Sequence, residues 1–218
     1  MKKNMYSLIL AEPVVAEIDR LAAEQGTNRS NLVNQILAEY VSLVTPEKRI
    51  RSVFDAIEHA LSGRDYFSMF AEPNDSTLSI KSALQYRYRP TVRYEVELYR
   101  TPENTIGLLK VLFRTQAPEL LLEMTAFFRL WIRMENLYVH RLYADGSVQY
   151  TLEEGKFTRT FVLPQDCEYD AEQTGFAISG YIAMFDDLLK GYLSGKYRQE
   201  TALENRYLEY LNSGMKLI

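Results

Sequence analysis

The first residues of the chain alternate between two faces in the manner of a short β-strand. Met5–Leu10 is rich in β-prone residues, and one face of the predicted strand carries Tyr6, Leu8 and Leu10. Pro13 then stands where a helix begins, and apolar residues recur at helical spacing as far as Gly26. A glycine directly after the last periodic position is typical of a helix C-terminus. The pattern therefore predicts a strand followed by a helix.

A second helix is predicted immediately afterwards. Asn28 is a good N-cap, Arg29-Ser30-Asn31 would form the first turn, and Thr45-Pro46 would end or kink the helix. Its apolar stripe is formed by Leu32, Val33, Ile36, Leu37 and Tyr40. A strand and two helices in so short a stretch cannot bury their own apolar faces, because small units hide too little of their surface. The N-terminal region is thus expected to need a partner.

The stretch Gly26-Thr27-Asn28-Arg29-Ser30-Asn31-Leu32-Val33 carries the most specific pattern. It combines a glycine, a small polar cap, a basic residue, a serine and an aliphatic pair. Together with the preceding strand and helix, it resembles the ribbon-helix-helix (Arc/MetJ-like) DNA-binding family over Asn4–Leu43. The resemblance implies a dimer in which two chains pair their strands antiparallel and intertwine their helices.

The same resemblance implies which residues contact double-stranded DNA. A two-stranded ribbon fits the major groove, so its outward side chains would read base edges while the turn before the second helix would hold the phosphate backbone. The implied contact residues are Lys3, Met5, Ser7, Ile9, Asn28, Arg29 and Ser30. Met5 and Ile9 depart from the polar or basic residues usual at outward positions, and they suit either thymine methyl groups or a protein contact. A two-fold dimer implies an inverted-repeat target.

From Pro46 onward the pattern changes to that of an α+β domain with an antiparallel sheet. We therefore expect two domains, residues 1–45 and residues 46–218, and the second resembles no family that we identify. Its predicted helices are Pro46–Gly63, Pro118–Tyr138, one capped by Asp170 and running through Leu189, and one containing Leu203–Leu211. Its predicted strands are Leu78–Tyr88, Val92–Arg100, Thr105–Phe113, Val148–Leu152 and Phe157–Leu163, with Ala71–Ser76 as a loop.

Composition modifies this interpretation only slightly. The 218 residues carry a formal charge of −4, whereas dedicated nucleic-acid binders are mostly basic. Residues 1–45 contain four basic and five acidic residues, a net charge of −1. DNA affinity must therefore depend on where the charges lie. A single cysteine, no cationic-apolar leader and no long uninterrupted apolar stretch favour a cytoplasmic protein without a membrane span.

Enzyme chemistry has little support in the sequence. His59 and His140 have no cysteine or carboxylate at metal-ligand spacing, and Asp186-Asp187 would point in different directions on a helix. Gly175 and Gly180 lie in a helical stretch, where close packing explains them better than a phosphate-binding loop does. We expect no catalytic residues, no metal and no cofactor.

Two features of the second domain leave alternatives open. Tyr86-Arg87-Tyr88-Arg89, followed by Arg93 and Tyr94, interleaves aromatic and basic residues, which suits nucleic acid or an anionic ligand but also an ordinary strand with a solvated face. Aromatic residues such as Phe127, Phe128 and Trp131 could line a ligand pocket, although this spacing is more typical of a core.

The sequence thus favours a homodimeric or larger transcription regulator such as a repressor, with its second domain serving oligomerisation, an effector or a protein partner. One alternative is that the ribbon-helix-helix only dimerises an interaction domain, which the acidic balance and Ile9 favour. Another is an antitoxin-like autoregulator, although antitoxins of this family typically carry a short flexible tail and not a folded domain.

Overall fold

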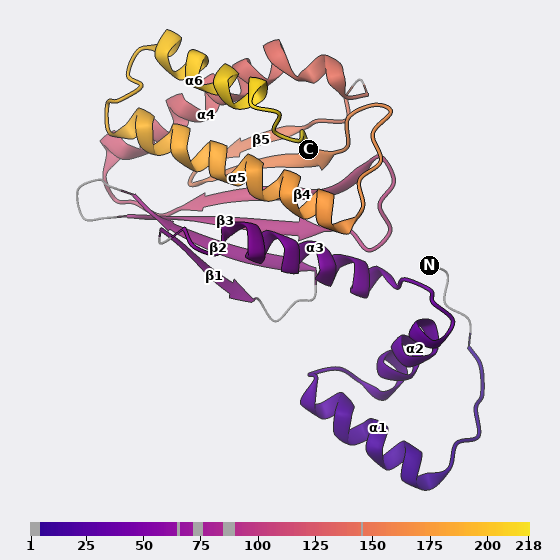
Figure 1. Ribbon diagram of the computed structural model, residues 1–218. Helices are drawn as coiled ribbons and strands as arrows, with labels where there is room; N and C mark the ends of the chain where they lie inside the picture. Colours follow the sequence, from indigo (N-terminus) through magenta and orange to yellow (C-terminus); the bar gives the residue numbers. More distant parts are fainter. Residues whose placement is uncertain (1–4, 65, 72–75, 85–89, 145) are drawn as a thin grey trace. The chain divides into compact units, whose positions relative to one another are not determined.

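The protein consists of two compact units, Met1–Arg49 and Ile50–Ile218. Its structure, a computed structural model, describes residues 5–64, 66–71, 76–84, 90–144 and 146–218. Over these residues it contains six α-helices, one short 3-10 helix and a six-stranded antiparallel sheet (Figure 1). Each unit has a hydrophobic cluster of its own. The predicted mixed α+β class is confirmed.

The two helices predicted in the first unit are present as α1 (Glu12–Glu24) and α2 (Arg29–Tyr40). Gly26 has a positive φ of 63°, and the chain around it closes α1 with two hydrogen bonds. Thr27 N–H donates to Ala22 O at 2.9 Å and Gly26 N–H donates to Ala23 O at 3.3 Å. This is a Schellman motif, which favours glycine at the left-handed position. The predicted glycine cap is confirmed.

The second helix ends earlier than the sequence indicates. α2 stops at Tyr40 and a new helix, α3, begins at Pro46. Ser42 has a φ of 56°, and Leu43 N–H donates to Ala38 O at 2.8 Å. A second Schellman motif therefore ends α2 without a glycine, and a left-handed serine was not expected from its residue type. The prediction that Thr45-Pro46 ends α2 is wrong; the pair starts α3 instead.

The stretch predicted as the ribbon strand lies in no helix or strand. Residues 5–10 are assigned to no helix or strand in the single chain. In a two-chain ribbon, each strand forms its β-ladder hydrogen bonds only with the strand of the other chain. A single chain would therefore show no strand here. The ribbon-helix-helix arrangement therefore stays a prediction.

The second unit follows the predicted order with one additional strand. Its helices are α3 (Pro46–Leu61), which begins at the end of the first unit, α4 (Pro118–Tyr138), η1 (His140–Leu142), α5 (Ala171–Leu193) and α6 (Glu200–Asn212). Its strands are β1 (Phe67–Ala71), β2 (Thr77–Ala83), β3 (Thr91–Leu98), β4 (Thr105–Phe113), β5 (Tyr150–Glu153) and β6 (Lys156–Val162). β1 was not predicted, and Ala71 belongs to it and not to the predicted loop. Most of that loop, residues 72–75, lies outside the described residues.

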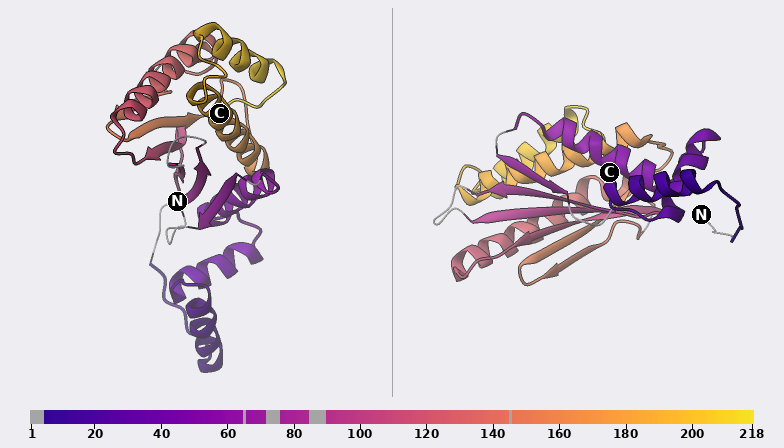
Figure 2. Two further views of the ribbon diagram at one scale, coloured as in Figure 1. Left: turned by 90° about the vertical axis from the view of Figure 1, so that its left-hand side faces the viewer. Right: turned by 90° about the horizontal axis from the view of Figure 1, so that it is seen from below.

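The sheet has the order β1-β2-β3-β4-β6-β5, with every neighbouring pair antiparallel. Along β3, β4 and β6 most residues alternate between a buried and a half-buried face, in keeping with the 2-residue period of a strand. On β3 the buried positions are Val92, Tyr94, Val96 and Leu98. α5 contacts both α4 and α6, and Figures 1 and 2 show it lying beside them.

An aromatic cluster joins the sheet to the helices. Phe127, Phe128 and Trp131 of α4 are fully buried, and all three contact the ring of Phe185 on α5. Trp131 Nε1 donates a hydrogen bond of 2.8 Å to Tyr181 Oη. These three residues are thus part of a packed core, which was the alternative favoured over a ligand pocket.

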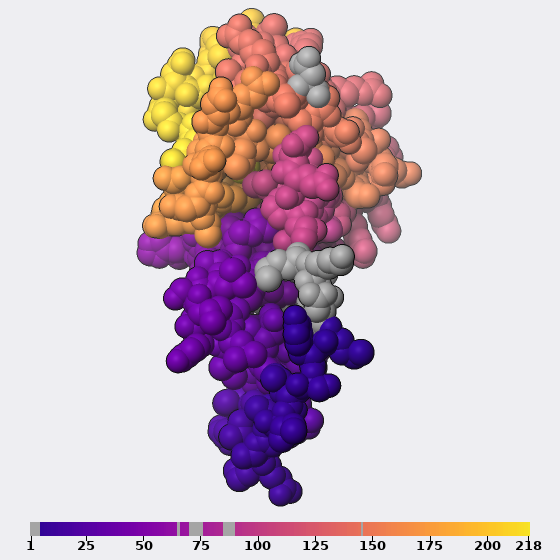
Figure 3. Space-filling view, turned by 90° about the vertical axis from the view of Figure 1, so that its right-hand side faces the viewer, coloured from indigo at the N-terminus to yellow at the C-terminus, as the bar shows by residue number. Residues whose placement is uncertain are grey.

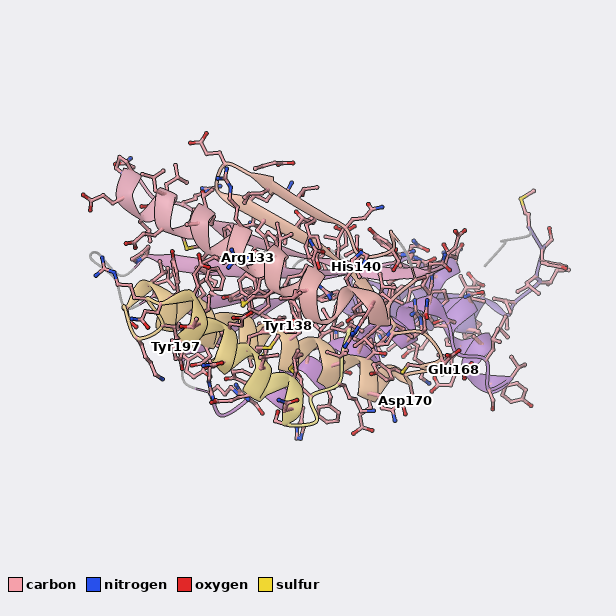
Figure 4. The ribbon with its side chains drawn as sticks, turned by 90° about the horizontal axis from the view of Figure 1, so that it is seen from above. Arg133, Tyr138, His140, Glu168, Asp170 and Tyr197 are labelled. Carbon is pink, nitrogen blue, oxygen red and sulfur yellow. The ribbon has the colours of Figure 1, made fainter. Side chains whose placement is uncertain are left out.

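Close packing and helix-bridging contacts complete this unit. A Cβ at Gly175 would lie 2.5 Å from Ala56 Cβ, so the glycine permits α5 to approach α3, as expected. α4 is linked to α6 by two polar contacts, both from side chains labelled in Figure 4. Arg133 pairs with Glu200 at 2.5 Å, and Tyr138 Oη donates to Glu204 at 2.5 Å.

Candidate nucleic-acid interface

The N-terminal stretch exposes its apolar side chains unequally. The residues predicted to face DNA are almost fully exposed, with Met5 at 99% and Ile9 at 103%. The residues predicted to face a shared core are less exposed, with Tyr6 at 81%, Leu8 at 60% and Leu10 at 41%. Ser7 is exposed, and Lys3 lies outside the described residues. In the space-filling view, the indigo atoms of this stretch lie at the surface (Figure 3).

The turn between α1 and α2 forms the second part of the candidate interface. Asn28 caps α2, since its Oδ1 accepts a hydrogen bond of 3.0 Å from Asn31 N–H. The first intrahelical bond runs from Leu32 N–H to Asn28 O at 3.0 Å. The N–H groups of Arg29 and Ser30 precede it, at the positive end of the helix dipole. Asn28, Arg29 and Ser30 are all exposed, so the structure brings these three predicted residues together.

Arg29 is held by a carboxylate that the sequence analysis did not single out. Its Nε donates to Asp19 Oδ1 at 2.7 Å and its Nη2 donates to Oδ2 at 2.5 Å. The Arg29 hydrogen bonds lower the pKa of Asp19, and the Asp19 carboxylate raises the pKa of Arg29. The two side chains come from different helices and are ten positions apart, so helical periodicity does not reveal the pair. The hairpin geometry of α1 and α2 creates it.

The other arginine of this region is also paired. Arg20 contacts both Glu17 and Glu24 on α1, which are favourable three- and four-residue spacings on a helix. Between residues 5 and 45, these two arginines are the basic residues. The described part of the candidate interface therefore has no uncompensated positive charge before residue 46.

The first unit leaves much of its apolar surface uncovered. Its buried cluster consists of Ile18, Ala22 and Leu32. The predicted apolar stripe of α2 is buried at its start but open at its end, where Ile36, Leu37 and Tyr40 are 46%, 51% and 89% exposed. Further exposed apolar side chains follow at Val41, Leu43 and Val44. So many exposed apolar side chains in a short segment are typical of a protein contact.

The second unit does not assemble the histidines into a site. His59 is exposed on α3, and His140 is half-buried in η1. His140 and Glu168 are clearly apart in Figure 4. Within the described residues, no group of three or more histidine, cysteine, aspartate or glutamate side chains could hold a metal ion.

The adjacent aspartates of α5 have separate roles, as expected from their helical positions. Asp186 is buried, accepts a hydrogen bond of 2.9 Å from Tyr94 Oη and lies 2.7 Å from Lys190 Nζ. Burial and the Asp186 charge raise the pKa of Tyr94. Asp187 instead contacts Arg206 at 3.3 Å. Both aspartates therefore join structural networks that connect neighbouring elements.

The interleaved aromatic and basic stretch is only partly described. Tyr86, Arg87, Tyr88 and Arg89 lie outside the described residues, so strand Leu78–Tyr88 can be followed only to its observed end at Ala83. Tyr94 is fully buried, whereas Arg93 is partly exposed and pairs with Glu95 at 2.7 Å. These two residues follow the strand interpretation, with the aromatic side chain inward and the charged one outward.

Over the described residues, the structure contains no helix that is both long and apolar enough to span a membrane. Comparison of the chain with protein-family models, curated proteins and solved structures found no match.

Proposed function

We propose that the protein is a dimeric, sequence-specific DNA-binding transcription regulator whose first unit is a ribbon-helix-helix module. The observation that carries the proposal is the number of exposed apolar side chains in that unit, both in the N-terminal stretch and at the end of α2. A second copy would cover these side chains. Antiparallel pairing of residues 5–10 from two chains would also supply the β-ladder that one chain lacks.

In this dimer, the two faces of the ribbon have different roles. Tyr6, Leu8 and Leu10 pack on the helices of the shared core, which agrees with the lower exposure of Leu8 and Leu10 already seen in one chain. Met5, Ser7 and Ile9 face the major groove. Ser7 can donate to or accept from a base edge, while Met5 and Ile9 contact thymine methyl groups. The start of α2 holds a phosphate through its N–H groups and Arg29.

Selection of bound sequences from a random pool of double-stranded DNA tests this function. The full chain is compared with a chain lacking residues 1–44. This truncation keeps Thr45, whose Oγ1 accepts a hydrogen bond of 3.2 Å from Lys48 N–H at the start of α3. We expect an inverted repeat to be enriched by the full chain and not by the truncated one. Failure to enrich any sequence at low salt would contradict the proposal.

A second candidate function is that the first unit only dimerises the protein, while the second unit binds a protein partner. Two observations favour it: Met5 and Ile9 place apolar side chains where DNA contacts are proposed, and the Arg29 charge is matched by Asp19. Salt dependence separates the two functions. Phosphate contacts give an affinity for DNA that falls steeply with salt, whereas a dimerisation module shows no DNA affinity.

Two single substitutions test whether Arg29 contacts the phosphate backbone and Ser7 contacts bases. We expect Arg29→Ala to weaken binding by about five- to tenfold at every sequence, because a phosphate contact is independent of sequence. We expect Ser7→Ala to change the preferred base at one position of each half-site, because a base contact specifies. Binding to a panel of singly substituted operators measures both effects.

Asn34→Ala, at an exposed position of α2, serves as the control for that panel and should bind like the unaltered chain. These separate roles are wrong if Arg29→Ala and Ser7→Ala change the affinity for every operator by the same factor.

A further inference from the structure

The Arg29 guanidinium, to which the proposed function assigns a DNA phosphate, is already paired with Asp19. We infer that Asp19 is a built-in competitor of that phosphate and limits the sequence-independent part of DNA binding. The inference rests on the proposed function and adds a regulating residue to the same site. It concerns a carboxylate on α1 that makes no proposed contact with DNA itself.

The geometry of the pair supports competition at one edge of the guanidinium. Nε and Nη2 of Arg29 donate to the two oxygens of one carboxylate, at 2.7 and 2.5 Å. A phosphate binds arginine through the same two-pronged arrangement. Asp19 therefore satisfies the donors that a phosphate would otherwise use, and the phosphate must displace it or share the arginine with it.

The pair is accessible to DNA and can exchange. The side chains of Arg29 and Asp19 are 55% and 46% exposed, and exposed ion pairs are weak because water and salt screen them. A phosphate can thus reach Arg29 without unfolding either helix. Glu17 and Glu24, the other carboxylates on this part of α1, are engaged by Arg20. Asp19 is consequently the carboxylate that faces Arg29.

Competition of this kind favours specific over non-specific binding. An arginine and a carboxylate side by side carry no net charge, so they neutralise a phosphate poorly and release fewer counterions. Every DNA sequence is affected equally, while contacts from the ribbon to base edges are unchanged. A smaller backbone contribution raises the share of affinity that depends on sequence. Asp19 acts here as a specificity-determining residue.

The test compares Asp19→Asn with Glu24→Gln in the full chain. Both substitutions remove one negative charge from the exposed side of α1, but only the first removes it from Arg29. Asparagine keeps an oxygen that accepts from Arg29, so the contact between α1 and α2 is retained. Binding is measured by fluorescence anisotropy with two 30-base-pair duplexes, one carrying the enriched inverted repeat and one of mixed sequence, over a range of salt concentrations.

We expect Asp19→Asn to tighten binding of the mixed-sequence duplex by about tenfold per dimer at low salt and to steepen the salt dependence by up to ~0.9 per protomer. Glu24→Gln should change the affinity by about twofold or less, because its charge is not at the phosphate contact. In an Arg29→Ala background, Asp19→Asn should have no larger effect than Glu24→Gln. That loss of coupling identifies Arg29 as the group through which Asp19 acts.

The outcomes separate the inference from the proposed function. Equal effects of Asp19→Asn and Glu24→Gln, with clear binding by the unaltered chain, overturn the inference and leave the regulator intact. No binding of either duplex by any variant at low salt overturns both. Binding by Asp19→Asn where the unaltered chain shows none supports the inference. Asp19→Ser, which removes the charge with a different side chain, must give the same direction of change as Asp19→Asn.

Discussion

Replacing Leu37 by aspartate is expected to convert the protein from a dimer to a monomer and to reduce its DNA affinity by more than about a hundredfold. Leu37 lies on α2 and is 51% exposed in the single chain, within the apolar surface that a second copy would cover. A charge buried at such an interface without a partner is strongly unfavourable. Light scattering during gel filtration measures the mass, which should be twice 25.3 kDa for the unaltered chain.

Asn34→Asp is the matched control for this prediction. It introduces the same charge on the same helix, three positions earlier, at an exposed residue outside the apolar stripe. It should leave both the dimer and DNA binding nearly unchanged. A monomeric mass for the unaltered chain, or a dimer that survives Leu37→Asp, would remove the main support for the ribbon-helix-helix proposal. The proposal depends on this surface, because the strands of the ribbon can pair only between the two chains of a dimer.

Features of the fold that depend on neighbouring residues could be predicted from the sequence. The Gly26 cap, the Asn28 cap and the start of α4 at Pro118 are set by chemistry within a single turn. β4 was predicted at its observed bounds, Thr105–Phe113, because a strand-like run follows the turn residues Thr101-Pro102-Glu103-Asn104. Local patterns of this kind need no knowledge of the tertiary structure.

Features that depend on distant residues could not be predicted in the same way. β1 is a five-residue edge strand, and its pairing with β2 is determined by the sheet and not by its own composition. The Asp19–Arg29 pair depends on how α1 and α2 fold back on each other. The proposed ribbon, which only the family resemblance predicts, would need a second chain. In each case the determining contact lies outside the window in which periodicity is visible.

The buried ion pair between Glu135 and Arg159 belongs to this second class, although the sequence contains a signal for it. Arg159 lies between Phe157 and Phe161 on β6, at a position where the alternation points inward. A charged residue at an inward position requires a buried partner. The partner is Glu135 on α4, whose Oε2 accepts a hydrogen bond of 3.0 Å from Arg159 Nε.

Removing that partner is expected to be the most destabilising single change in the second unit. The side chains of Arg159 and Glu135 are each 1% exposed. Burial by itself would lower the pKa of Arg159, but Glu135 together with the nearby Tyr181, Tyr143 and Tyr150 raises the pKa, so the guanidinium stays charged. Glu135→Ala leaves this charge buried without its counter-ion. We expect the free energy of unfolding in urea to fall by about 3–5 kcal/mol.

The exposed pair of Arg133 and Glu200 provides the control, because Glu200→Ala removes the same kind of carboxylate from an arginine in water. Its side chains are 63% and 59% exposed, so the change in unfolding free energy should be small. The double variant Glu135→Leu with Arg159→Met should recover most of the stability lost in Glu135→Ala, because no charge is then buried. If Glu135→Ala is as stable as Glu200→Ala, water must reach Arg159 and the buried pair does not exist in solution. If Glu135→Ala is unstable and the double variant is not, the cost comes from the unpaired arginine and not from lost packing around Glu135.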